Sequence, residues 1–413
     1  MALSDLYSKK QVEVLKRVRA EDWFMLINHG AVRAGKTNVD NDIFLQELIR
    51  VKKIATSLGI DEPMYILGGV SSGTIQTNIL QELTNKYGIE FQFDKHNNFK
   101  LFGVKIIQTF TGTIAGLKSI RGMTAFGAYI NEGTLANKEV FDEIIKRCSG
   151  EGARIICDTN PDHPGHWLKK DYIDNPSKNI ISFHFVLTDN TFLSQRYIDN
   201  LIETTPSGVF TDRGIFGLWT VGEGAVYKDF DGEKHYIHSS EIPKLTHFYC
   251  GVDWGYEHYG SIVVVGQTDS GEAYLIEEYA KQHEEIDYWV DIAKDVQKRY
   301  GRMIPFYCDT ARPEHIARFT REKLNAIYAD KSILSGVEAV ARRFKSGKLF
   351  VASDNVEKFK DEIYQYIWDK KSGKPREEHD DVLDALRYAI YSSEVYGASS
   401  VKERADAAKL FFG

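Results

Sequence analysis

One stretch of the chain decides the fold of its first half: His29-Gly30-Ala31-Val32-Arg33-Ala34-Gly35-Lys36-Thr37-Asn38. It matches the P-loop pattern G-x-x-x-x-G-K-[ST] at every fixed position. The apolar run Trp23-Phe24-Met25-Leu26-Ile27 precedes it and is typical of a buried strand. A strand, a glycine-rich turn and a helix form the context in which this pattern binds phosphate, so the stretch predicts a nucleoside triphosphate site.

Each fixed position of the P-loop has a physical role. Gly30 and Gly35 let the backbone bend so that its N–H groups surround phosphate oxygens, and the following helix N-terminus adds a favourable dipole. Lys36 is expected to reach the β- and γ-phosphates, and Thr37 to hold Mg²⁺. Arg33 in the loop and Arg121 further along are both candidates to stabilise transition-state charge, in cis or across a subunit boundary.

Length and composition narrow the class of protein. A chain of 413 residues is too long for one typical core and suggests two domains. Its four cysteines, far apart and without a C-x-x-C pair, indicate small buried hydrophobes in a reducing compartment. We find no signal-peptide pattern and no apolar run long enough for a bilayer, so we expect a cytoplasmic protein without a membrane partner. A net charge of −7 leaves nucleic-acid binding to local basic patches.

The order of the elements predicts the fold class. Strand-like and helix-like segments alternate through the first half, which indicates an α/β, doubly wound and mostly parallel sheet. Strands are expected at 64–68, 104–110, 125–130 and 153–157, and helices at 38–54 and 76–87. Glycines accumulate from Ser207 to Gly232, which we interpret as a linker region. Further strands are expected at 247–253, 261–268, 272–279 and 304–308, with a hairpin turn at 269–271 and a helix at 286–300.

A P-loop ATPase needs an acid on a second strand to position the attacking water. Glu132 follows the apolar run 126–130 and is the candidate general base. The usual pair at this place is Asp-Glu, so Asn131 is a departure, although its amide oxygen can accept from a Mg²⁺-bound water. The alternative is that Glu132 is a surface carboxylate in a turn. Cys157-Asp158-Thr159-Asn160-Pro161 ends the next strand, and its polar residues are expected to face the same crevice.

The second half carries a separate set of acids. Asp253 and Asp309 each end a predicted strand, and Asp380, Asp381 and Asp384 lie together in the run 378–388. At helical spacings of three and four, two of these last carboxylates share a face. Clustered carboxylates repel unless a cation neutralises them, so the set predicts a pair of Mg²⁺ or Mn²⁺ ions that cleave phosphodiesters. Taken singly, each Asp could equally be a cap or turn residue.

These features together resemble the large terminase subunit of tailed bacteriophages, over roughly Leu6 to Tyr391. The similar runs are Ser8-Lys9-Lys10-Gln11, the P-loop, Ser119-Ile120-Arg121-Gly122, Thr159-Asn160-Pro161, Arg213-Gly214-Ile215-Phe216-Gly217-Leu218-Trp219, Glu223-Gly224-Ala225-Val226-Tyr227, Asp253-Trp254-Gly255, Cys308-Asp309 and Asp384-Ala385-Leu386-Arg387-Tyr388. In that family the first of these runs recognises adenine, and the run ending in Asn160-Pro161 is the coupling motif.

The resemblance implies an N-terminal P-loop ATPase with a mostly parallel sheet and a C-terminal RNase H-like nuclease with a mixed sheet. The expected domains are the ATPase at 1–205, a linker at 206–240, the nuclease at 241–395 and a tail at 396–413. Catalytic roles are expected for Glu132, Lys36, Arg33, Asp253, Asp309 and Asp384. ATP with Mg²⁺ is expected at Gln11, Gly30, Arg33, Ala34, Gly35, Lys36, Thr37, Asn38 and Asn160. Two Mg²⁺ or Mn²⁺ are expected at Asp253, Asp309 and Asp384, assisted by Asp381 or Asp380, a choice that stays open.

The function that the resemblance implies is a viral DNA-packaging motor. ATP hydrolysis would drive double-stranded DNA into the procapsid, and the nuclease would cut concatemeric DNA at initiation and termination. The expected partners are double-stranded DNA, the portal protein, the small terminase subunit and further copies of the chain, which form a ring on the portal and are expected as monomers in solution. Its expected place is the host cytoplasm, outside the mature virion.

Two other functions compete with this one. A helicase-like ATPase fused to a repair nuclease would need a second motor lobe, and the sequence shows one P-loop. A docking subunit without activity is disfavoured by the intact Lys36, Glu132 and Asp253. Two basic segments, 342–348 and 370–376, are expected either to contact DNA or to be solvated loops.

Overall fold

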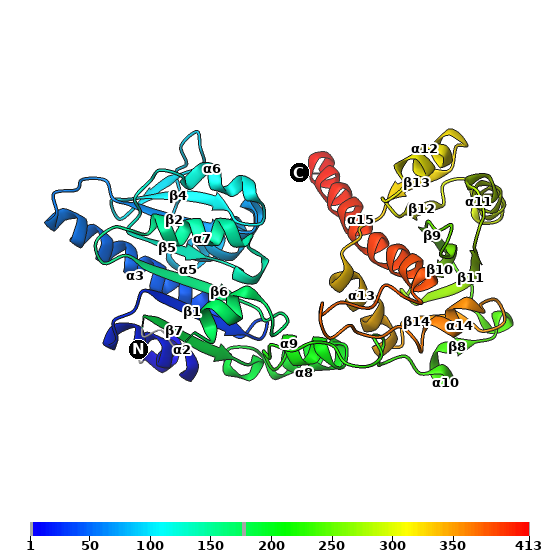
Figure 1. Cartoon of the computed structure of the whole chain (residues 1–413), viewed down its shortest axis with the longest axis horizontal. Helices are drawn as coiled ribbons and strands as arrows, with labels where there is room; N and C mark the ends of the chain where they lie inside the picture. Colours follow the sequence, from blue (N-terminus) through cyan, green and yellow to red (C-terminus); the bar gives the residue numbers. More distant parts are fainter. Residues whose placement is uncertain (1–2, 176–178, 413) are drawn as a thin grey trace. The chain divides into compact units, whose positions relative to one another are not determined.

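The computed structural model describes residues 3–175 and 179–412 and divides the chain into two compact units (Figure 1). Unit 1 comprises the chain up to Ile202 together with Thr211–Thr220. Unit 2 comprises Glu203–Phe210 and the chain from Val221 onward. The segment 206–240, expected as a linker, is thus shared between the two units.

Unit 1 is built on a seven-stranded sheet in the order β3-β4-β2-β5-β6-β1-β7. Its strands are β1 Met25–Gly30, β2 Met64–Gly69, β3 Phe99–Leu101, β4 Val104–Phe110, β5 Gly127–Ile130, β6 Arg154–Thr159 and β7 Ile180–Phe185. All neighbours pair in parallel except β3 and β4. Two strands, β6 and β7, flank β1, so the end of β6 lies between the ends of β1 and β5.

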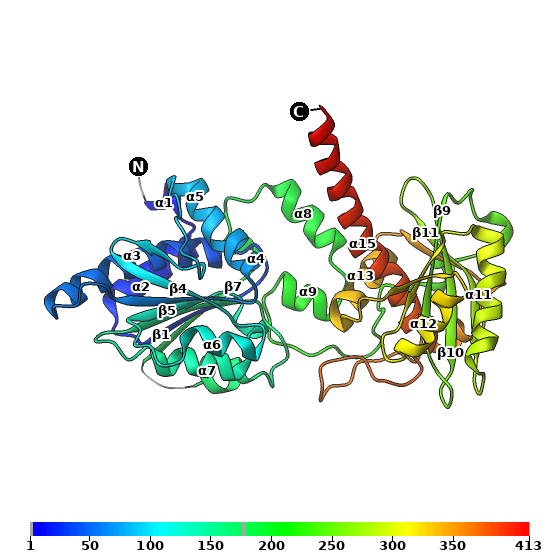
Figure 2. The ribbon, with the colours of Figure 1, turned by 90° about the horizontal axis from the view of Figure 1, so that it is seen from above.

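Helices cover both faces of this sheet. The helices of this unit are α1 Leu3–Leu6, α2 Lys9–Ala20, α3 Lys36–Ser57, α4 Ser72–Ile75, α5 Gln81–Tyr87, α6 Leu117–Ile120 and α7 Lys138–Arg147, while α8 Gln195–Thr204 extends into unit 2 and α9 Val209–Gly214 begins in unit 2 and ends in unit 1. Figure 2 shows α2 and α3 on one side of the strands and α6 and α7 on the other. Along β1, Leu26 is buried with the first group and Ile27 with the second. This alternation explains why the strand reads as a continuous apolar run.

Unit 2 is also built on a seven-stranded sheet, in the order β13-β12-β9-β10-β11-β14-β8. Its strands are β8 Tyr236–Ile237, β9 His247–Asp253, β10 Gly260–Gln267, β11 Ala273–Lys281, β12 Pro305–Cys308, β13 Asn325–Tyr328 and β14 Leu349–Ala352. Strand β10 is antiparallel to β9 and to β11, and the other neighbours are parallel, so the sheet is mixed as predicted.

Two pairs of helices enclose the second sheet. The helices of this unit are α10 Gly232–His235, α11 Ile286–Tyr300, α12 Pro313–Arg321, α13 Ile333–Lys345, α14 Lys358–Glu362 and α15 Asp381–Phe412. One core holds residues of α13 and α15, and the other holds residues of α11 and α12 (Figure 2). The segment from residue 396, expected as a tail, continues α15 up to Phe412.

The structure bears on three expectations from the sequence: the fold class, the state of the cysteines and the presence of membrane-spanning helices. The α/β class with one mostly parallel and one mixed sheet is confirmed. All four cysteines are buried and free, as predicted. Within residues 3–175 and 179–412, we find no helix that is both long and apolar enough to cross a bilayer.

Candidate functional sites

The P-loop lies between β1 and α3, as the pattern predicts. Gly30 ends β1 with a φ of +134° and Gly35 precedes α3 with a φ of +90°, conformations that L side chains rarely adopt. A Cβ atom at Gly30 would also lie 2.0 Å from the carbonyl oxygen of Phe185 on β7. Glycine is therefore required at Gly30 by the backbone conformation and by the close packing of β7.

Lys36 is buried inside the loop, with 6% of its surface exposed. Its ammonium group donates hydrogen bonds to the carbonyl oxygens of Gly30 at 3.0 Å and Ala31 at 2.5 Å, and to Oδ1 of Asn160 at 3.1 Å. Burial lowers the Lys36 pKa to about 8, against the opposing effect of nearby carboxylates led by Asp158. Asn160, at the end of β6, is thus in direct contact with the P-loop lysine.

A pocket of about 540 Å³ lies over the P-loop. Its wall combines the loop with the residues that follow β5 and those at the end of β6. The predicted site residues that line it are Arg33, Ala34, Gly35, Lys36, Thr37, Asn38, Glu132 and Asn160. Arg121 is not among the lining residues and is exposed at the end of α6, so of the two arginines only Arg33 is placed at this pocket.

A second pocket of about 430 Å³ shares Gly35, Asn38 and Asn190 with the first. Gln11 lines it and donates from Nε2 to the carbonyl oxygen of Gly35 at 2.9 Å. The side chain of Gln11 also completes a capping box with Ser8 at the start of α2. Helix α2 is therefore tied to the P-loop through the residue predicted to recognise the base.

Glu132 follows β5 with a φ of +58°, in the left-handed region. Non-glycine residues are uncommon there, and such strain clusters at functional sites. Burial, and then the charge of Asp158, raises the pKa of the Glu132 carboxyl. A half-buried carboxylate with a raised pKa, lining the same pocket as the P-loop, has the properties of a general base.

Asp158 lines this pocket, as expected for the polar residues of the run 157–161, although the sequence assigns it no role of its own. It is 2% exposed, and its carboxylate accepts from the Tyr129 hydroxyl at 3.0 Å and from the Glu132 N–H at 3.0 Å. It also accepts from Nδ2 of Asn131 at 2.7 Å, while Oδ1 of Asn131 accepts from Asn78 at 3.0 Å. The strand order, which brings β6 beside β5, is the signal that would have predicted these contacts.

In unit 2 the predicted acids gather at one edge of the sheet. Asp253 ends β9 and Asp309 follows β12, and these strands are parallel neighbours. Helix α15 packs on β9 and carries Asp384 in its first turn. Burial, followed by the charges of Asp384 and Asp309, raises the pKa of Asp253 well above its usual value. The pKa rises because the carboxylates of Asp384 and Asp309 are close enough to Asp253 to repel its charge.

Two of these acids have cationic partners. Nζ of Lys331 lies 2.5 Å from Oδ1 of Asp309, and Nη2 of Arg387 lies 2.6 Å from Oδ2 of Asp384. Among the described residues, no three His, Cys, Asp or Glu side chains are arranged to hold a metal ion. The donor chemistry still fits a divalent cation, because carboxylate oxygens are the ligands that Mg²⁺ and Mn²⁺ prefer.

Asp380 and Asp381 both belong to this acidic cluster. Burial, and then the charge of Asp384, raises the Asp380 pKa to about 7. Burial also raises the Asp381 pKa, but Lys358 and His258 oppose the effect. The carbonyl of Asp381 accepts from the Ser261 hydroxyl at 2.7 Å, which joins the start of α15 to β10. Which of the two carboxylates assists the other acids stays open.

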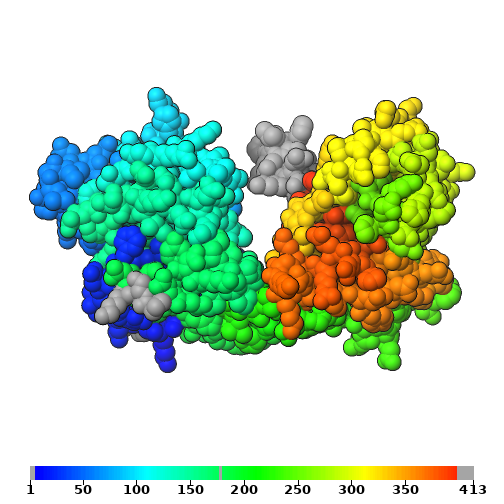
Figure 3. Space-filling view, in the orientation of Figure 1, coloured from blue at the N-terminus to red at the C-terminus, as the bar shows by residue number. Residues whose placement is uncertain are grey.

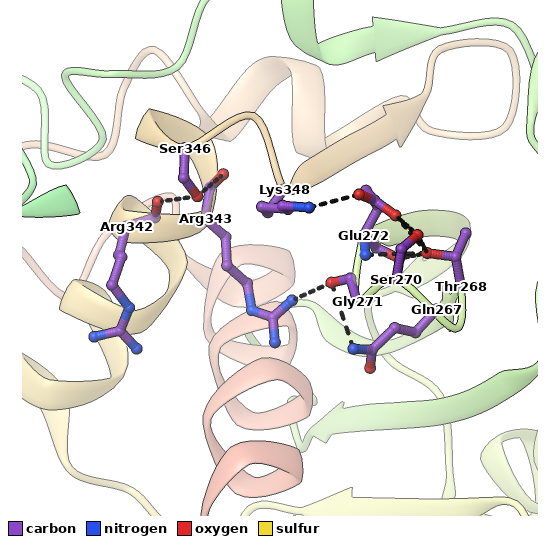
Figure 4. Close-up of polar contacts among 9 residues, drawn as sticks. All are labelled: Gln267, Thr268, Ser270, Gly271, Glu272, Arg342, Arg343, Ser346 and Lys348. Atoms are coloured by element: carbon purple, nitrogen blue, oxygen red, sulfur yellow. Dashed lines mark hydrogen bonds and ion pairs between the residues drawn. The ribbon is translucent and has the colours of Figure 1, made fainter. Parts of the chain in front are cut away.

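The two basic segments have different surroundings. Segment 342–348 lies beside the turn between β10 and β11 (Figure 4). Its two arginines pair with Glu394 at 3.0 and 2.9 Å, and its last lysine pairs with Glu272 at 2.6 Å. Segment 370–376 lies between α14 and α15 at the surface of unit 2, in orange in Figure 3, and its lysines and arginine are exposed. The second segment is therefore the better candidate for a polyanion.

Comparisons with known proteins were made for the whole chain. A family model described as phage terminase large subunit matches residues 76–208, and one described as terminase RNaseH-like domain matches residues 250–393. A crystal structure of the large terminase from a thermophilic bacteriophage is 24% identical, with a TM-score of 0.79, and the match covers 94% of this chain and 99% of that chain. No curated protein matches this chain.

Two further structures of the same thermophilic phage protein are also similar. Its complexes with ADP and with ATP-γ-S each match with a TM-score of 0.77 at 24% identity. These matches cover 93% and 94% of this chain and 98% of each of those chains. The common fold therefore extends over both units. Since a terminase model falls on each unit, the chain is similar to the phage terminase large subunits, as an enzyme with an ATPase unit and an RNase H-like nuclease unit.

Proposed function

We infer that this chain is the motor that packages viral DNA. ATP hydrolysis in unit 1 drives double-stranded DNA into a procapsid, and unit 2 cuts concatemeric DNA when packaging begins and ends. The observation that carries this function is the presence, in one chain, of a P-loop pocket with a buried lysine and an acidic edge of an RNase H-like sheet. The two family matches favour it over a helicase-like ATPase fused to a repair nuclease.

The first pocket supports ATP as the fuel. Lys36 and the backbone of the P-loop would bind the phosphates, Thr37 would hold Mg²⁺, and Glu132 would take the proton of the attacking water. Bound Mg²⁺ would neutralise charge on the phosphate oxygens. The similar terminase of the thermophilic phage binds ADP and ATP-γ-S, which supports an adenine nucleotide in this chain as well.

The acidic edge of unit 2 supports metal-dependent cleavage of DNA. Asp253, Asp309 and Asp384, with Asp380 or Asp381, would hold two Mg²⁺ or Mn²⁺ ions. Such ions activate water and stabilise the leaving oxygen. The exposed lysines and arginine of segment 370–376 would pair with the phosphate groups of the DNA backbone.

The partners and the place of action follow from this function. The chain would act on the portal of the procapsid in the host cytoplasm, with the small terminase subunit presenting the DNA. Several copies in a ring would surround the DNA, and the chain in solution would be a monomer.

A DNA-protection assay tests the motor. The chain, procapsids with portal, small subunit and linear DNA are mixed, and the DNA that resists added DNase is measured. Wild type should protect DNA only with ATP, and Lys36→Ala should protect none, because stabilisation of the transferred phosphoryl group is lost. Protection by Lys36→Ala equal to wild type would contradict the motor.

Plasmid cleavage with Mn²⁺ tests the nuclease in the same preparations. Asp253→Ala should leave plasmid uncut while packaging linear DNA and hydrolysing ATP like wild type, because the metal ligands are separate from the P-loop. Asp61→Asn, which removes an exposed charge of unit 1, should match wild type in both assays. Cleavage by Asp253→Ala at the wild-type rate would contradict the nuclease assignment.

A further inference from the structure

The position after β5 lacks the carboxylate that P-loop ATPases usually carry there. Asn131 occupies it, 1% exposed, and its amide oxygen already accepts a hydrogen bond from Asn78 at 3.0 Å. Mg²⁺ prefers anionic oxygen ligands in proteins, and a neutral amide adds no charge. An ATPase built on this strand therefore needs its carboxylate from another residue.

Asp158 lies beside Asn131 on the neighbouring strand. The parallel register of β5 and β6 places the two residues next to each other, and Nδ2 of Asn131 donates to Oδ1 of Asp158 at 2.7 Å. Asp158 lines the same pocket as Lys36 and Thr37. The Asp158 carboxylate is thus hydrogen-bonded directly to Asn131, the residue at the position of the usual carboxylate.

The hydrogen bonds of Asp158 leave one acceptor position of its carboxylate for a further ligand. Oδ1 of Asp158 accepts from Asn131 and from the Glu132 N–H, and Oδ2 accepts from the Tyr129 hydroxyl. An ionised carboxylate has about four acceptor positions, so these donors fix its orientation and leave one position over. Its charge also reaches the nucleotide site, since Asp158 is the leading carboxylate that opposes the burial effect on the Lys36 pKa.

We propose that Asp158 supplies the carboxylate of the ATPase metal site, and that Asn131 orients it. The assignment rests on the proposed ATPase function and deepens it by naming the acid that acts on Mg²⁺. The donor set fits the cation, because the Thr37 hydroxyl and the Asp158 carboxylate are oxygen ligands that line one pocket.

The test measures how Mg²⁺ changes nucleotide affinity, in the full chain and without turnover. The Kd for ATP-γ-S is determined by calorimetry in saturating Mg²⁺ and again in EDTA. For wild type, Mg²⁺ should tighten binding. In Asp158→Asn, the factor by which Mg²⁺ lowers the Kd for ATP-γ-S should be about 10- to 100-fold smaller than in wild type. Its affinity in EDTA should be equal or tighter, because a negative charge near the phosphates is gone, whereas a merely disordered pocket would weaken both values.

A charge swap provides the decisive variant. The double variant Asn131→Asp with Asp158→Asn moves the negative charge from position 158 to position 131 of the same hydrogen-bonded pair. It should restore the effect of Mg²⁺ on the Kd for ATP-γ-S. Asp61→Asn is the matched control for loss of one charge in unit 1 and should bind like wild type. A full Mg²⁺ effect in Asp158→Asn overturns the assignment, and so does a swap variant that keeps the wild-type Tm yet stays deficient. A wild-type chain that binds no nucleotide under either condition overturns the proposed function, and the assignment with it.

Discussion

Glu132 holds a left-handed backbone conformation that costs a non-glycine residue on the order of 1–3 kcal/mol. Its N–H donates a hydrogen bond of 3.0 Å to the Asp158 carboxylate, and this bond keeps Glu132 in that conformation. We expect Glu132→Gln to bind ATP like wild type but to hydrolyse it about 10²- to 10⁴-fold more slowly, because the amide keeps the shape and cannot take a proton. Phosphate release and the Kd for ATP, measured together, check both parts.

A matched variant separates this effect from a general loss of charge. Glu139→Gln changes an exposed carboxylate in the first turn of α7 and should release phosphate like wild type. Phosphate release by Glu132→Gln at the wild-type rate would show that another group accepts the proton.

Lys331 would compete with a divalent cation for Asp309, because both would neutralise the same carboxylate. Its Nζ lies 2.5 Å from Oδ1 of Asp309. Lys331→Ala should therefore lower the Mn²⁺ concentration needed to stabilise unit 2 by about tenfold, the effect of removing one nearby opposite charge. Thermal unfolding of the full chain against Mn²⁺ concentration measures this, and Lys331→Arg, which keeps the charge, serves as the control. An unchanged Mn²⁺ dependence in the Ala variant would remove Lys331 from the site.

The predicted site residues that line the pocket over the P-loop are those that one contiguous motif or one strand end supplies. Lys36 and Thr37 belong to the P-loop pattern, and Glu132 follows an apolar run, so their places follow from local order. The contacts of Asp158 and Lys331 were not predicted, because they join segments that are distant in the chain; Asp158 was expected only to face the crevice. The placement of the metal ligands and of the base stays a prediction.

Helix α15 owes the position of its first turn to a carboxylate outside it. Glu362, the last residue of α14, accepts from the N–H groups of Val382 at 2.9 Å and Leu383 at 3.2 Å. These N–H groups are among those that a helix leaves without partners at its start. Burial raises the Glu362 pKa to about 7. Glu362 therefore positions the helix that carries Asp381 and Asp384.

The raised pKa of Glu362 has a consequence for stability against pH. The folded state favours the protonated carboxyl, so the stability that this group contributes is present at low pH and declines as pH rises from the ordinary glutamate pKa of 4.5 to about 7. Gln does not titrate. Glu362→Gln should thus be close to wild type at pH 5 and gain stability relative to wild type at pH 8, in urea unfolding of the full chain. A relative stability that falls with pH would contradict the assigned shift. Glu362→Ala, which does not titrate either, should lose about 1 kcal/mol or more at pH 5, and this deficit relative to wild type should shrink at pH 8.

At the level of elements, long periodic segments were predicted well and short or edge elements were not. The predicted strands at 104–110 and 247–253 coincide with β4 and β9, and the predicted helix at 286–300 coincides with α11. Strands β3 and β8 are short, and each lies at the edge of its sheet. Neither strand therefore shows in the sequence as a run of buried apolar residues. The segment 76–87, predicted as one helix, is part of a run interrupted by a π-helical turn.

One segment of unit 1 lies, in the sequence, between two parts of unit 2. Thr211–Thr220 belongs to unit 1, although the residues on both sides of it belong to unit 2. Nε1 of Trp219 donates to Nδ1 of His29 at 3.1 Å, next to the P-loop. Burial lowers the His29 pKa to about 3, so the ring is neutral and can accept. The glycine-rich composition predicted a boundary here, but it could not reveal that the segment packs against the P-loop.

Gly217 shows how close this packing is. A Cβ atom there would lie 2.6 Å from the Ala31 nitrogen and 2.4 Å from the Phe185 oxygen. Gly217→Ala should therefore displace the P-loop and weaken ATP binding by about tenfold or more, since small misplacements of a binding loop are costly. Gly224→Ala is the matched control, because Gly224 also has a positive φ, of +71°, and nothing lies within 4 Å of its Cβ position. Equal Kd values for ATP in the two variants would show that the P-loop tolerates this contact.

The residues before β9 decide where an independent nuclease unit begins. Val226 and Tyr227 are each 3% exposed, the Val226 N–H donates to the Tyr366 carbonyl at 2.9 Å, and the Tyr227 ring lies 5.8 Å from that of Phe344. A fragment that starts at Val221 keeps these contacts and β8, whereas one that starts at the predicted boundary of 241 removes them.

We expect the fragment from Val221 to the C-terminus to unfold cooperatively in urea and to cut plasmid with Mn²⁺ in the absence of ATP, because its sheet is present and its two cores lack only Val209 and the partly buried Phe210 among the described residues. The fragment from Glu241 should be less stable by several kcal/mol, about the cost of leaving large cavities in a core. Urea midpoints and plasmid cleavage of the two fragments measure the difference. If both fragments unfold at the same urea concentration, residues 221–240 are a linker after all, and the buried side chains they contribute add nothing to the nuclease core.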